Sequence, residues 1–409
     1  MIKISKWFKI YYNKITGSIA FIPAIIALAF LLFSWIMLEI DFSDWGKHLK
    51  STLSWLSLKD ASTARSIVST VAGALISLTV FSFSLVMIVL NQAASQMSNR
   101  VLASMIENRI QQIILGFYIG TIVYALFLLS TIRDINSGIY VPALSIYLLI
   151  LLTVIDIFLF IYFLDYVTQT VKYETVIHRV QEQTMKTMKK RFEEIKNESF
   201  SKPMLSFQEI RAPESNYFQS FNESKLLQIA TDKNLFICFL YTQATYLIKG
   251  SVFMEIYSKE PVDKDCMDEL MATSDFYKGQ PIQLNADYGF NQIAEVAIKA
   301  LSPGINDPGT AVICLHALSD LLAYRLRYKL PSGRYDEKSV QRIYIPATTF
   351  REIFEKCILP IWNYGKKDDY IQQQLILMTK QLKVADHKKE YAVLFDTLIN
   401  EVEKEKRVE

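Results

Sequence analysis

Charged residues and metal-ligating side chains are scarce in this chain of 409 residues. Only 21% of the residues are charged, and there are four cysteines and four histidines. The cysteines are Cys238, Cys266, Cys314 and Cys357. None belongs to a Cys-x-x-Cys pair or has a histidine at metal-ligand spacing, so the sequence indicates neither a zinc site nor a disulfide framework. We interpret the cysteines as small core residues in a reducing compartment, and we predict no metal site.

The local motifs of common enzyme classes are also missing. There is no Gly-x-x-x-x-Gly-Lys-Ser/Thr phosphate loop, no Gly-x-Ser-x-Gly elbow, no His-Glu-x-x-His and no kinase signature. The histidines, His48, His178, His316 and His387, are far apart. Distant residues can meet in a fold, but the sequence predicts no catalytic residue and no cofactor. With 44 basic against 41 acidic residues, no nucleic-acid partner is expected.

Hydrophobic residues, in contrast, make up 51% of the chain and gather in its first third. They form four runs, 18–38, 66–90, 113–132 and 139–164. Each run is about as long as the roughly 20 residues that cross a bilayer as a helix. The sequence therefore predicts a polytopic α-helical membrane protein with four spans, in contact with membrane lipid.

Basic residues predict the orientation of these spans. Lys3, Lys6, Lys9 and Lys14 precede the first run, which is too long for a signal peptide and has no evident cleavage site after it. We interpret it as a retained anchor. Lysines beside a span resist translocation, and the stretch after Tyr166 is also rich in lysine and arginine. We therefore expect both termini in the cytoplasm.

Beyond the spans the sequence predicts a cytoplasmic α+β region. The predicted domains are a membrane domain at 1–166, a helical stalk at 167–200, a small β-module at 201–260 and a mainly helical domain at 261–409. The stalk carries one apolar stripe, which needs a partner in another subunit or in the same chain. The stripe comprises Val167, Val171, Ile177, Val180, Met188, Phe192 and Ile195.

Short β-prone runs and longer helical patterns follow the stalk. The predicted strands are 205–210, 217–221, 226–230, 235–241 and 252–257, with one later run at 340–345. The predicted helices are 291–301, 308–330, 348–364, 369–382 and 388–406.

The second hydrophobic run is unusually rich in small polar residues. Thr70, Gly73, Ser77 and Ser84 recur on one helical face. Such a face favours tight helix packing, or it lines a water-filled pore in a homo-oligomer. Asp156, in the middle of the fourth run, either tunes such a path or is a protonated hydrogen-bonding group between helices.

A turn at 300–311 contains two prolines and two glycines. Asp307 followed by Pro308 is typical of a helix N-terminus, whose free amides can receive an anion. The candidate ligand- or partner-binding residues are Ser302, Gly304, Asn306, Asp307 and Thr310. The carboxylate of Asp307 would itself occupy those amides, so a purely structural turn is the other interpretation.

The segments 300–311, 287–294, 80–85, 91–96 and 111–120 together resemble the domain of unknown function 2254 family of bacterial predicted membrane proteins. The resemblance covers nearly the whole chain, with departures at Asn216 and Gly309. It implies four spans in a bacterial inner membrane and a cytoplasmic C-terminal region, and it implies no activity. The β-module is also similar to a biotinyl/lipoyl-type barrel-sandwich hybrid, although no lysine stands in a recognisable carrier hairpin.

These patterns lead to two functional hypotheses. The first is a homo-oligomeric ion channel or channel-like permeation protein, whose order of domains is similar to that of small-conductance mechanosensitive channels. The second is a membrane-anchored sensor or scaffold whose cytoplasmic domain binds a ligand or a protein partner.

Overall fold

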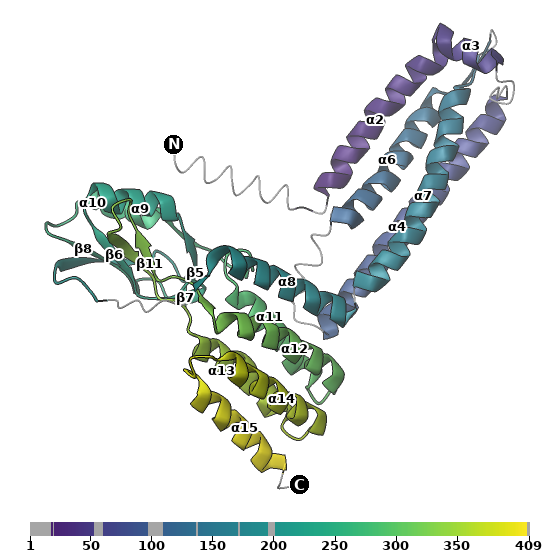
Figure 1. Cartoon of the computed structure of the whole chain (residues 1–409). Helices are drawn as coiled ribbons and strands as arrows, with labels where there is room; N and C mark the ends of the chain where they lie inside the picture. Colours follow the sequence, from purple (N-terminus) through teal and green to yellow (C-terminus); the bar gives the residue numbers. More distant parts are fainter. Residues whose placement is uncertain are drawn as a thin grey trace. The chain divides into compact units, whose positions relative to one another are not determined.

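The structure is a computed structural model that describes residues 18, 20–52, 60–96, 109–135, 138–170, 172–194 and 201–406. It separates into two compact units, with the boundary between Lys172 and Tyr173. We call them the membrane unit and the C-terminal unit (Figure 1). The four N-terminal lysines and the stalk residues Val171 and Ile195 lie outside the described residues.

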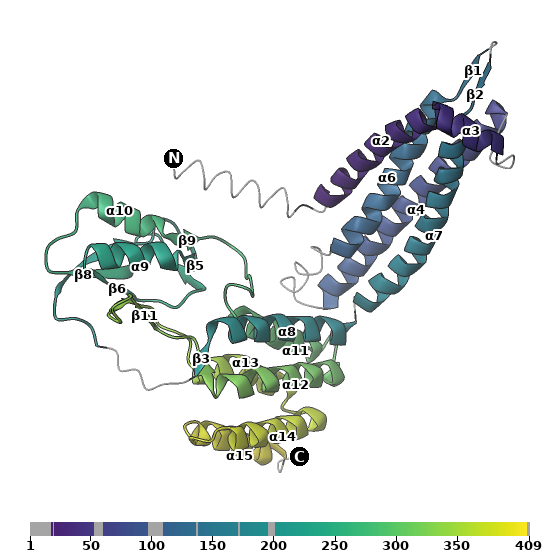
Figure 2. The ribbon, with the colours of Figure 1, turned by 45° about the horizontal axis from the view of Figure 1, so that its top comes forward.

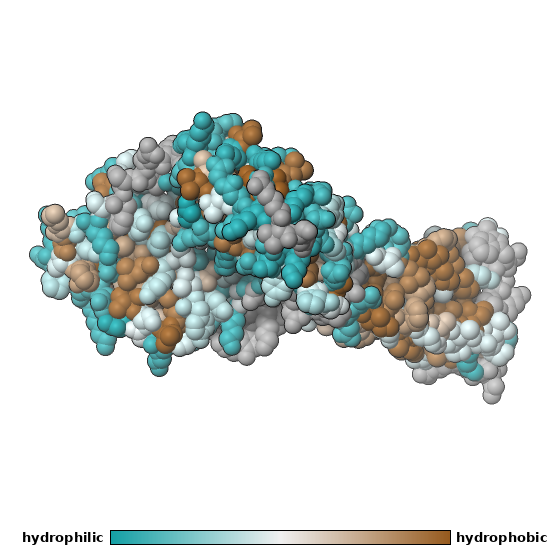
Figure 3. Space-filling view, turned by 90° about the horizontal axis from the view of Figure 1, so that it is seen from below, coloured by the Kyte–Doolittle hydropathy of each residue, from teal (hydrophilic) through white to brown (hydrophobic). Residues whose placement is uncertain are grey.

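The membrane unit contains four helices long and apolar enough to span a bilayer, which confirms the predicted spans. They are α2 (Phe21–Phe42), α4 (Ala61–Gln96), α6 (Arg109–Thr131) and α7 (Ala143–Thr170). The short helix α3 (Asp44–Thr52) and the hairpin of β1 (Arg133–Ile135) and β2 (Gly138–Tyr140) lie at one end of this bundle (Figure 2). In Figure 3 the membrane helices present a broad apolar surface. Phe158 and Val80 are among the large hydrophobic side chains exposed on these helices.

Two glycines bring α2 and α6 close together. Gly116 and Gly120 stand four residues apart on α6, and a Cβ atom at either position would collide with Ile26 or Phe30 of α2. Small residues at this spacing let helix backbones approach in a membrane, where close packing replaces the hydrophobic effect as the source of helix association. α6 is accordingly the most enclosed span, with 50% of its apolar window buried against 17% in α4.

One face of α4 packs inward against α6 and α7. Ala61, Ala64 and Val68 of α4 share a buried cluster with Tyr124 and Leu149. Further along, Leu78 and Leu85 pack on a second cluster around Tyr118 and Phe163. The opposite face of α4 is left exposed in the single chain.

The C-terminal unit begins with α8 (Tyr173–Arg191), which packs against α11 (Asp287–Ala300) and α12 (Pro308–Arg325). Ile177, Val180 and Met188 of the predicted stripe are buried there, so their partner belongs to the same chain. α7 ends at Thr170 and α8 starts at Tyr173, so two separate helices replace one continuous stalk. Gly289 of α11 allows the close approach, because a Cβ atom there would collide with Thr184 of α8.

Two sheets form the β part of this unit. The first has the order β11-β12-β6-β8-β4, antiparallel except for the pair β12 and β6, and the second has the order β7-β5-β9. Their strands are β4 (Ser206–Arg211), β5 (Asn216–Phe221), β6 (Phe236–Phe239), β7 (Thr245–Leu247), β8 (Val252–Ser258), β9 (Ser274–Phe276), β11 (Gly333–Tyr335) and β12 (Gln341–Tyr344). The pair β3 (Glu193–Glu194) and β10 (Tyr328–Lys329) is separate. The sheets thus include strands from well beyond residue 260.

The predicted strand 226–230 is wrong, because this segment lies in helix α9 (Glu223–Asp232). The side chain of Asn222 accepts a hydrogen bond from the backbone N–H of Lys225 at 3.1 Å and so caps the helix. Leu226, Ile229 and Ala230 then point into one core, at helical spacing. α9 and α10 (Lys264–Ala272) both pack on the strands (Figure 2), so helices form part of the core of this β region.

The last helices agree with the predicted ones. α13 (Phe350–Gly365), α14 (Asp369–Ala385) and α15 (Ala392–Lys406) follow one another, and α14 packs against both α12 and α15. Thr349 and Glu352 form a reciprocal capping box at the start of α13. Asp368 caps α14 through the N–H of Ile371 at 2.9 Å.

Candidate functional sites

The four candidate residues on α4 all lie on its exposed face. Thr70, Gly73, Ser77 and Ser84 are exposed, and a Cβ atom added at Gly73 would meet no atom within 4 Å. Ser77 donates to the carbonyl of Gly73 at 3.0 Å, and Ser84 donates to that of Val80 at 2.9 Å. The hydroxyl protons are therefore satisfied within the helix, while oxygen lone pairs remain directed outward.

Asp156 does not share that face. It is 0% exposed, inside the bundle of one chain, and it interacts with Tyr118 and Thr121 of α6. Tyr118 in turn interacts with Ser82, which lies on the buried face of α4. The structure therefore separates Asp156 from the four exposed residues of α4 and places it in an enclosed polar cluster.

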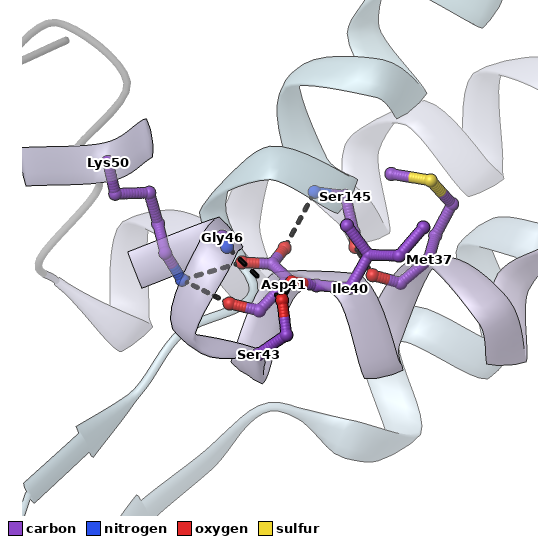
Figure 4. A network of polar contacts seen from close by, with 7 residues as sticks. All are labelled: Met37, Ile40, Asp41, Ser43, Gly46, Lys50 and Ser145. Carbon is purple, nitrogen blue, oxygen red and sulfur yellow. Dashed lines mark hydrogen bonds and ion pairs between the residues drawn. The ribbon is translucent and has the colours of Figure 1, made fainter. Parts of the chain in front are cut away.

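A second buried carboxylate, Asp41, lies at the end of the bundle where α2, α3 and α7 meet (Figure 4). Lys50 of α3 contacts its Oδ1 and its backbone oxygen, both at 2.7 Å. The backbone N–H of Ser145, in the first turn of α7, donates to Oδ2 at 2.8 Å. A negative charge at a helix N-terminus is favourable, and the carboxylate of Asp41 lies at that of α7. The carboxylate and the ammonium of Lys50 also form a charge-assisted hydrogen bond with each other. No sequence pattern marks this site, because its residues are brought together only by the fold.

The turn before α12 has the geometry of a self-capped helix start. Asp307 accepts hydrogen bonds from the N–H of Thr310 at 3.1 Å and from its hydroxyl at 2.6 Å. Asn306 adopts a positive φ of 50°, and its side chain is exposed together with Gly304, while Ser302 donates to the carbonyl of Lys299. The carboxylate of Asp307 therefore occupies one backbone N–H group at the start of α12, that of Thr310.

A cavity of about 420 Å³ lies within the C-terminal unit, between the β5 and β7 region and helices α11 and α13. Tyr217, Asn291, Glu295 and Lys356 are among its lining residues. Gln280 also lines it, and its buried Oε1 atom has no hydrogen-bond partner. The volume is in the range of small-ligand pockets, and the lining combines aromatic, acidic, basic and amide groups. Sequence spacing gave no sign of it, because the lining comes from separate elements.

Beside this cavity a buried arginine ties several elements together. Arg325 of α12 donates to the carbonyl of Thr348 at 2.6 Å and lies 4.9 Å from the ring centre of Phe192. The hydroxyl of Thr348 donates to Asp287 of α11 at 2.6 Å. Burial lowers the pKa of Arg325, and the charge of Asp287 opposes that shift. The arrangement fixes α11 and α12 around the segment that precedes α13.

The described residues include no group of three or more histidine, cysteine, aspartate or glutamate side chains that could hold a metal ion. The four cysteines are free and buried. Burial raises the pKa of Cys238 to about 11 and that of Cys357 to about 12, so both thiols are protonated at neutral pH. Thiols held in this state are poor nucleophiles.

A bundle of apolar helices, long enough to span a bilayer and followed by a mixed helical and sheet region, defines an integral membrane protein. Residues 16–381 match the model of the family described as "Predicted membrane protein (DUF2254)", and the chain belongs to that family. Uncharacterized proteins of Mycobacterium bovis and Mycobacterium tuberculosis are each 21% identical to it over 324 residues. The match covers 76% of this chain and 62% of each relative. No solved structure matches the chain significantly.

Proposed function

We propose that this protein is a channel-like permeation protein that works as a homo-oligomer, with the exposed faces of its α4 helices turned toward one another. The observation that carries the proposal is the spacing of residues along the exposed face of α4. One stripe of exposed residues on that face runs at alternating steps of four and three: Ser66, Thr70, Gly73, Ser77, Val80, Ser84 and Met87. This is the repeat of a left-handed helix–helix contact, in which one stripe of each helix faces its neighbours.

The composition of this α4 seam favours a polar path over a sealed apolar contact. Between Ser66 and Ser77 it consists of hydroxylated residues and glycine, whereas the exposed face of α7 carries Phe158 and Ile161. Repeated around a central axis, the seam would present rings of hydroxyl oxygens to water or to an ion. Asp156 lies off the seam, so it does not line the proposed path.

The N-terminal lysines and the basic stretch after Tyr166 support a cytoplasmic location for both termini. With this orientation the C-terminal unit lies in the cytoplasm and the α3 and β1–β2 end of the bundle faces the opposite side. We propose the bacterial inner membrane as the location, because the family match is to a predicted membrane protein and the similar proteins come from Mycobacterium bovis and Mycobacterium tuberculosis.

Disulfide cross-linking between copies tests the assembly. In protein reconstituted in nanodiscs, Ser77→Cys should form dimers linked through α4 on oxidation, because Ser77 lies on the seam. Phe158→Cys, on the exposed face of α7, is the matched control and should remain monomeric on denaturing gels. The native cysteines are buried, so they should not form cross-links between copies of the folded protein. A monomeric mass in nanodiscs, or equal cross-linking at both positions, would exclude this assembly.

Permeability is tested separately, in liposomes that contain the oligomer. Ser77→Phe should reduce the flux of small ions at unchanged oligomeric mass, because a bulky ring would fill a path lined by small side chains. Phe158→Leu should leave the flux unchanged. An intact oligomer that conducts no ions would show that the α4 seam serves packing alone.

The cavity in the C-terminal unit favours a second function, that of a membrane-anchored sensor for a small polar molecule. Its mixed lining and the unpartnered Oε1 atom of Gln280 support this alternative. Native mass spectrometry of the purified protein would detect a retained small molecule. Ala294 lines the cavity, so Ala294→Leu should reduce its occupancy. An empty cavity in protein purified from native membranes would count against the sensor.

A further inference from the structure

The interior of the membrane unit contains a cluster of polar atoms without partners. Both carboxylate oxygens of Asp156, the phenol oxygen of Tyr118 and the hydroxyl oxygen of Ser82 are buried, and none of them has a well-formed hydrogen bond. They come from α7, α6 and α4, respectively. Buried polar groups almost always have a hydrogen-bond partner. Three buried groups that lack one and lie in the same place therefore indicate a bound ligand.

The surroundings offer Asp156 no counter-charge. Leu85 and Val86 of α4, Ile114 of α6 and Phe160 of α7 belong to the adjacent apolar cluster. The basic side chains of lysine and arginine described in the membrane unit lie near helix ends or in connecting segments: Lys47, Lys50, Arg65, Arg109 and Lys172. No ion pair to Asp156 occurs among the described residues. An ionised carboxylate in such a setting is strongly unfavourable unless a cation accompanies it.

We propose that Asp156, Tyr118 and Ser82 form a binding site for one monovalent cation, a proton or Na⁺, inside the helix bundle of each chain. One carboxylate balances a single positive charge, and oxygen ligands suit a hard cation. A divalent ion would leave a net charge in the apolar interior. The site lies within one chain and differs from the α4 seam, so it does not depend on the proposed assembly.

The hydroxyl of Thr121 completes the polar wall of this site. It donates its proton to the carbonyl of Phe117 at 3.0 Å, which leaves its lone pairs available to a cation. Tyr118 is the titratable neighbour that α6 contributes. The segment 72–89 of α4 has no titratable residue, and those of α2 are Glu39 and Asp41, near its end. Exchange of the cation should therefore depend on Asp156 itself.

Thermal unfolding of the full-length protein in nanodiscs tests this site. The midpoint is measured over a range of pH, and over a range of Na⁺ concentration with choline holding the ionic strength constant. A ligand that binds only the folded protein raises the midpoint, here by about 2–4 °C for each tenfold increase above its dissociation constant. A pH response that is weaker in Asp156→Asn, without a response to Na⁺, identifies a proton, and a response to Na⁺ at fixed pH identifies Na⁺. Either supports the site.

Asp156→Asn should remove the response to Na⁺, or the part of the pH response that comes from this site, because the amide needs no cation. Asp165→Asn, at an exposed position near the end of α7, is the matched control and should respond as the wild type does. Equal responses of the wild type and Asp156→Asn, or no response of the wild type, would overturn the proposal.

Infrared difference spectra of the wild-type protein decide the question if Asp156→Asn fails to fold. The carbonyl band of a protonated carboxylic acid should appear on acidification for a proton site, or disappear on addition of Na⁺ for a sodium site. A band that is present and constant at every pH and Na⁺ concentration would show a permanently protonated structural group and would contradict an exchangeable site.

Discussion

The carboxylate of Asp41, at the end of α2, accepts a hydrogen bond from the backbone N–H of Ser145, 104 residues later in the first turn of α7. The opposite oxygen of the same carboxylate holds Lys50 of α3 at 2.7 Å. Tyr124 of α6 donates to the carbonyl of Ser145 at 3.1 Å, so the network reaches a third span. One end of the bundle is therefore fixed by polar contacts, whereas the rest of its interior depends mainly on apolar packing.

Asp41→Ala should destabilise the membrane unit by about 3–5 kcal/mol, because it leaves the ammonium of Lys50 and the amide of Ser145 without their partner. Unfolding in mixed detergent micelles with increasing denaturant measures the loss. Asp44→Ala is the matched control: Asp44 pairs with Lys47 on the surface, where an ion pair contributes only about 0–1 kcal/mol. Equal effects of the two substitutions would show that the Asp41 network does not hold the helices together.

The contact between α2 and α6 depends on the absence of side chains at Gly116 and Gly120. Gly120→Val should separate the two helices, because the added atoms would overlap the ring of Phe30. Overpacking of this kind costs about 1–3 kcal/mol. Ala74→Val is the control, since Ala74 is exposed on α4 and does not belong to the α4 seam. The unfolding midpoints of the wild type and both variants in detergent test the contact between α2 and α6. A Gly120→Val protein as stable as the wild type would contradict this contact.

The sequence was sufficient to predict the four spans, because a run of about 20 apolar residues has few alternatives to crossing a membrane. The late helices were predictable for a similar reason, since caps such as Thr349 and Asp368 mark their starts. The segment 226–230 was mistaken for a strand because five residues are too few to distinguish the two periodicities. The cap at Asn222, four residues earlier, was the available signal for a helix.

The sites were harder to predict than the fold. Asp156 was identifiable as an isolated carboxylate in an apolar run, but the nearby Tyr118 and Ser82 are ordinary residues of other helices. The Asp41 network and the cavity beside Tyr288 depend on residues that are far apart in the chain. Only the packing of helices and strands brings such groups together, and periodicity along one segment contains no information on it.

The close approach of α8 and α11 makes Gly289 intolerant of any side chain. Gly289→Ala would place a methyl group on the hydroxyl of Thr184, which is buried and donates to the carbonyl of Val180 at 2.6 Å. We expect a loss of about 1–3 kcal/mol in the free energy of unfolding. Gly304→Ala, in the exposed turn before α12, is the matched control, because a Cβ atom there meets no atom within 4 Å. If both variants unfold at the same denaturant concentration, the two helices do not pack as described.

Asp336 gives the C-terminal unit a contribution to stability that depends on pH. Its carboxylate accepts hydrogen bonds from the guanidinium of Arg342 at 2.8 Å and from the N–H groups of Lys338 and Val340, both at 2.9 Å. These contacts, first of all that with Arg342, hold the pKa of Asp336 below its usual value of 3.8. The folded protein therefore binds this proton less readily than the unfolded chain does.

A carboxylate whose pKa is lowered by folding stabilises the protein fully above its unfolded pKa, and this contribution is lost as the pH falls through the folded value. Asp336→Asn should accordingly lower stability at pH 7 and lose less on acidification to about pH 3 than the wild type does. Urea unfolding at both pH values, with the exposed neighbour substituted as Glu337→Gln for control, measures the difference. A wild type and an Asp336→Asn variant that lose the same stability between these pH values would show that the contacts of Asp336 do not distinguish its two protonation states.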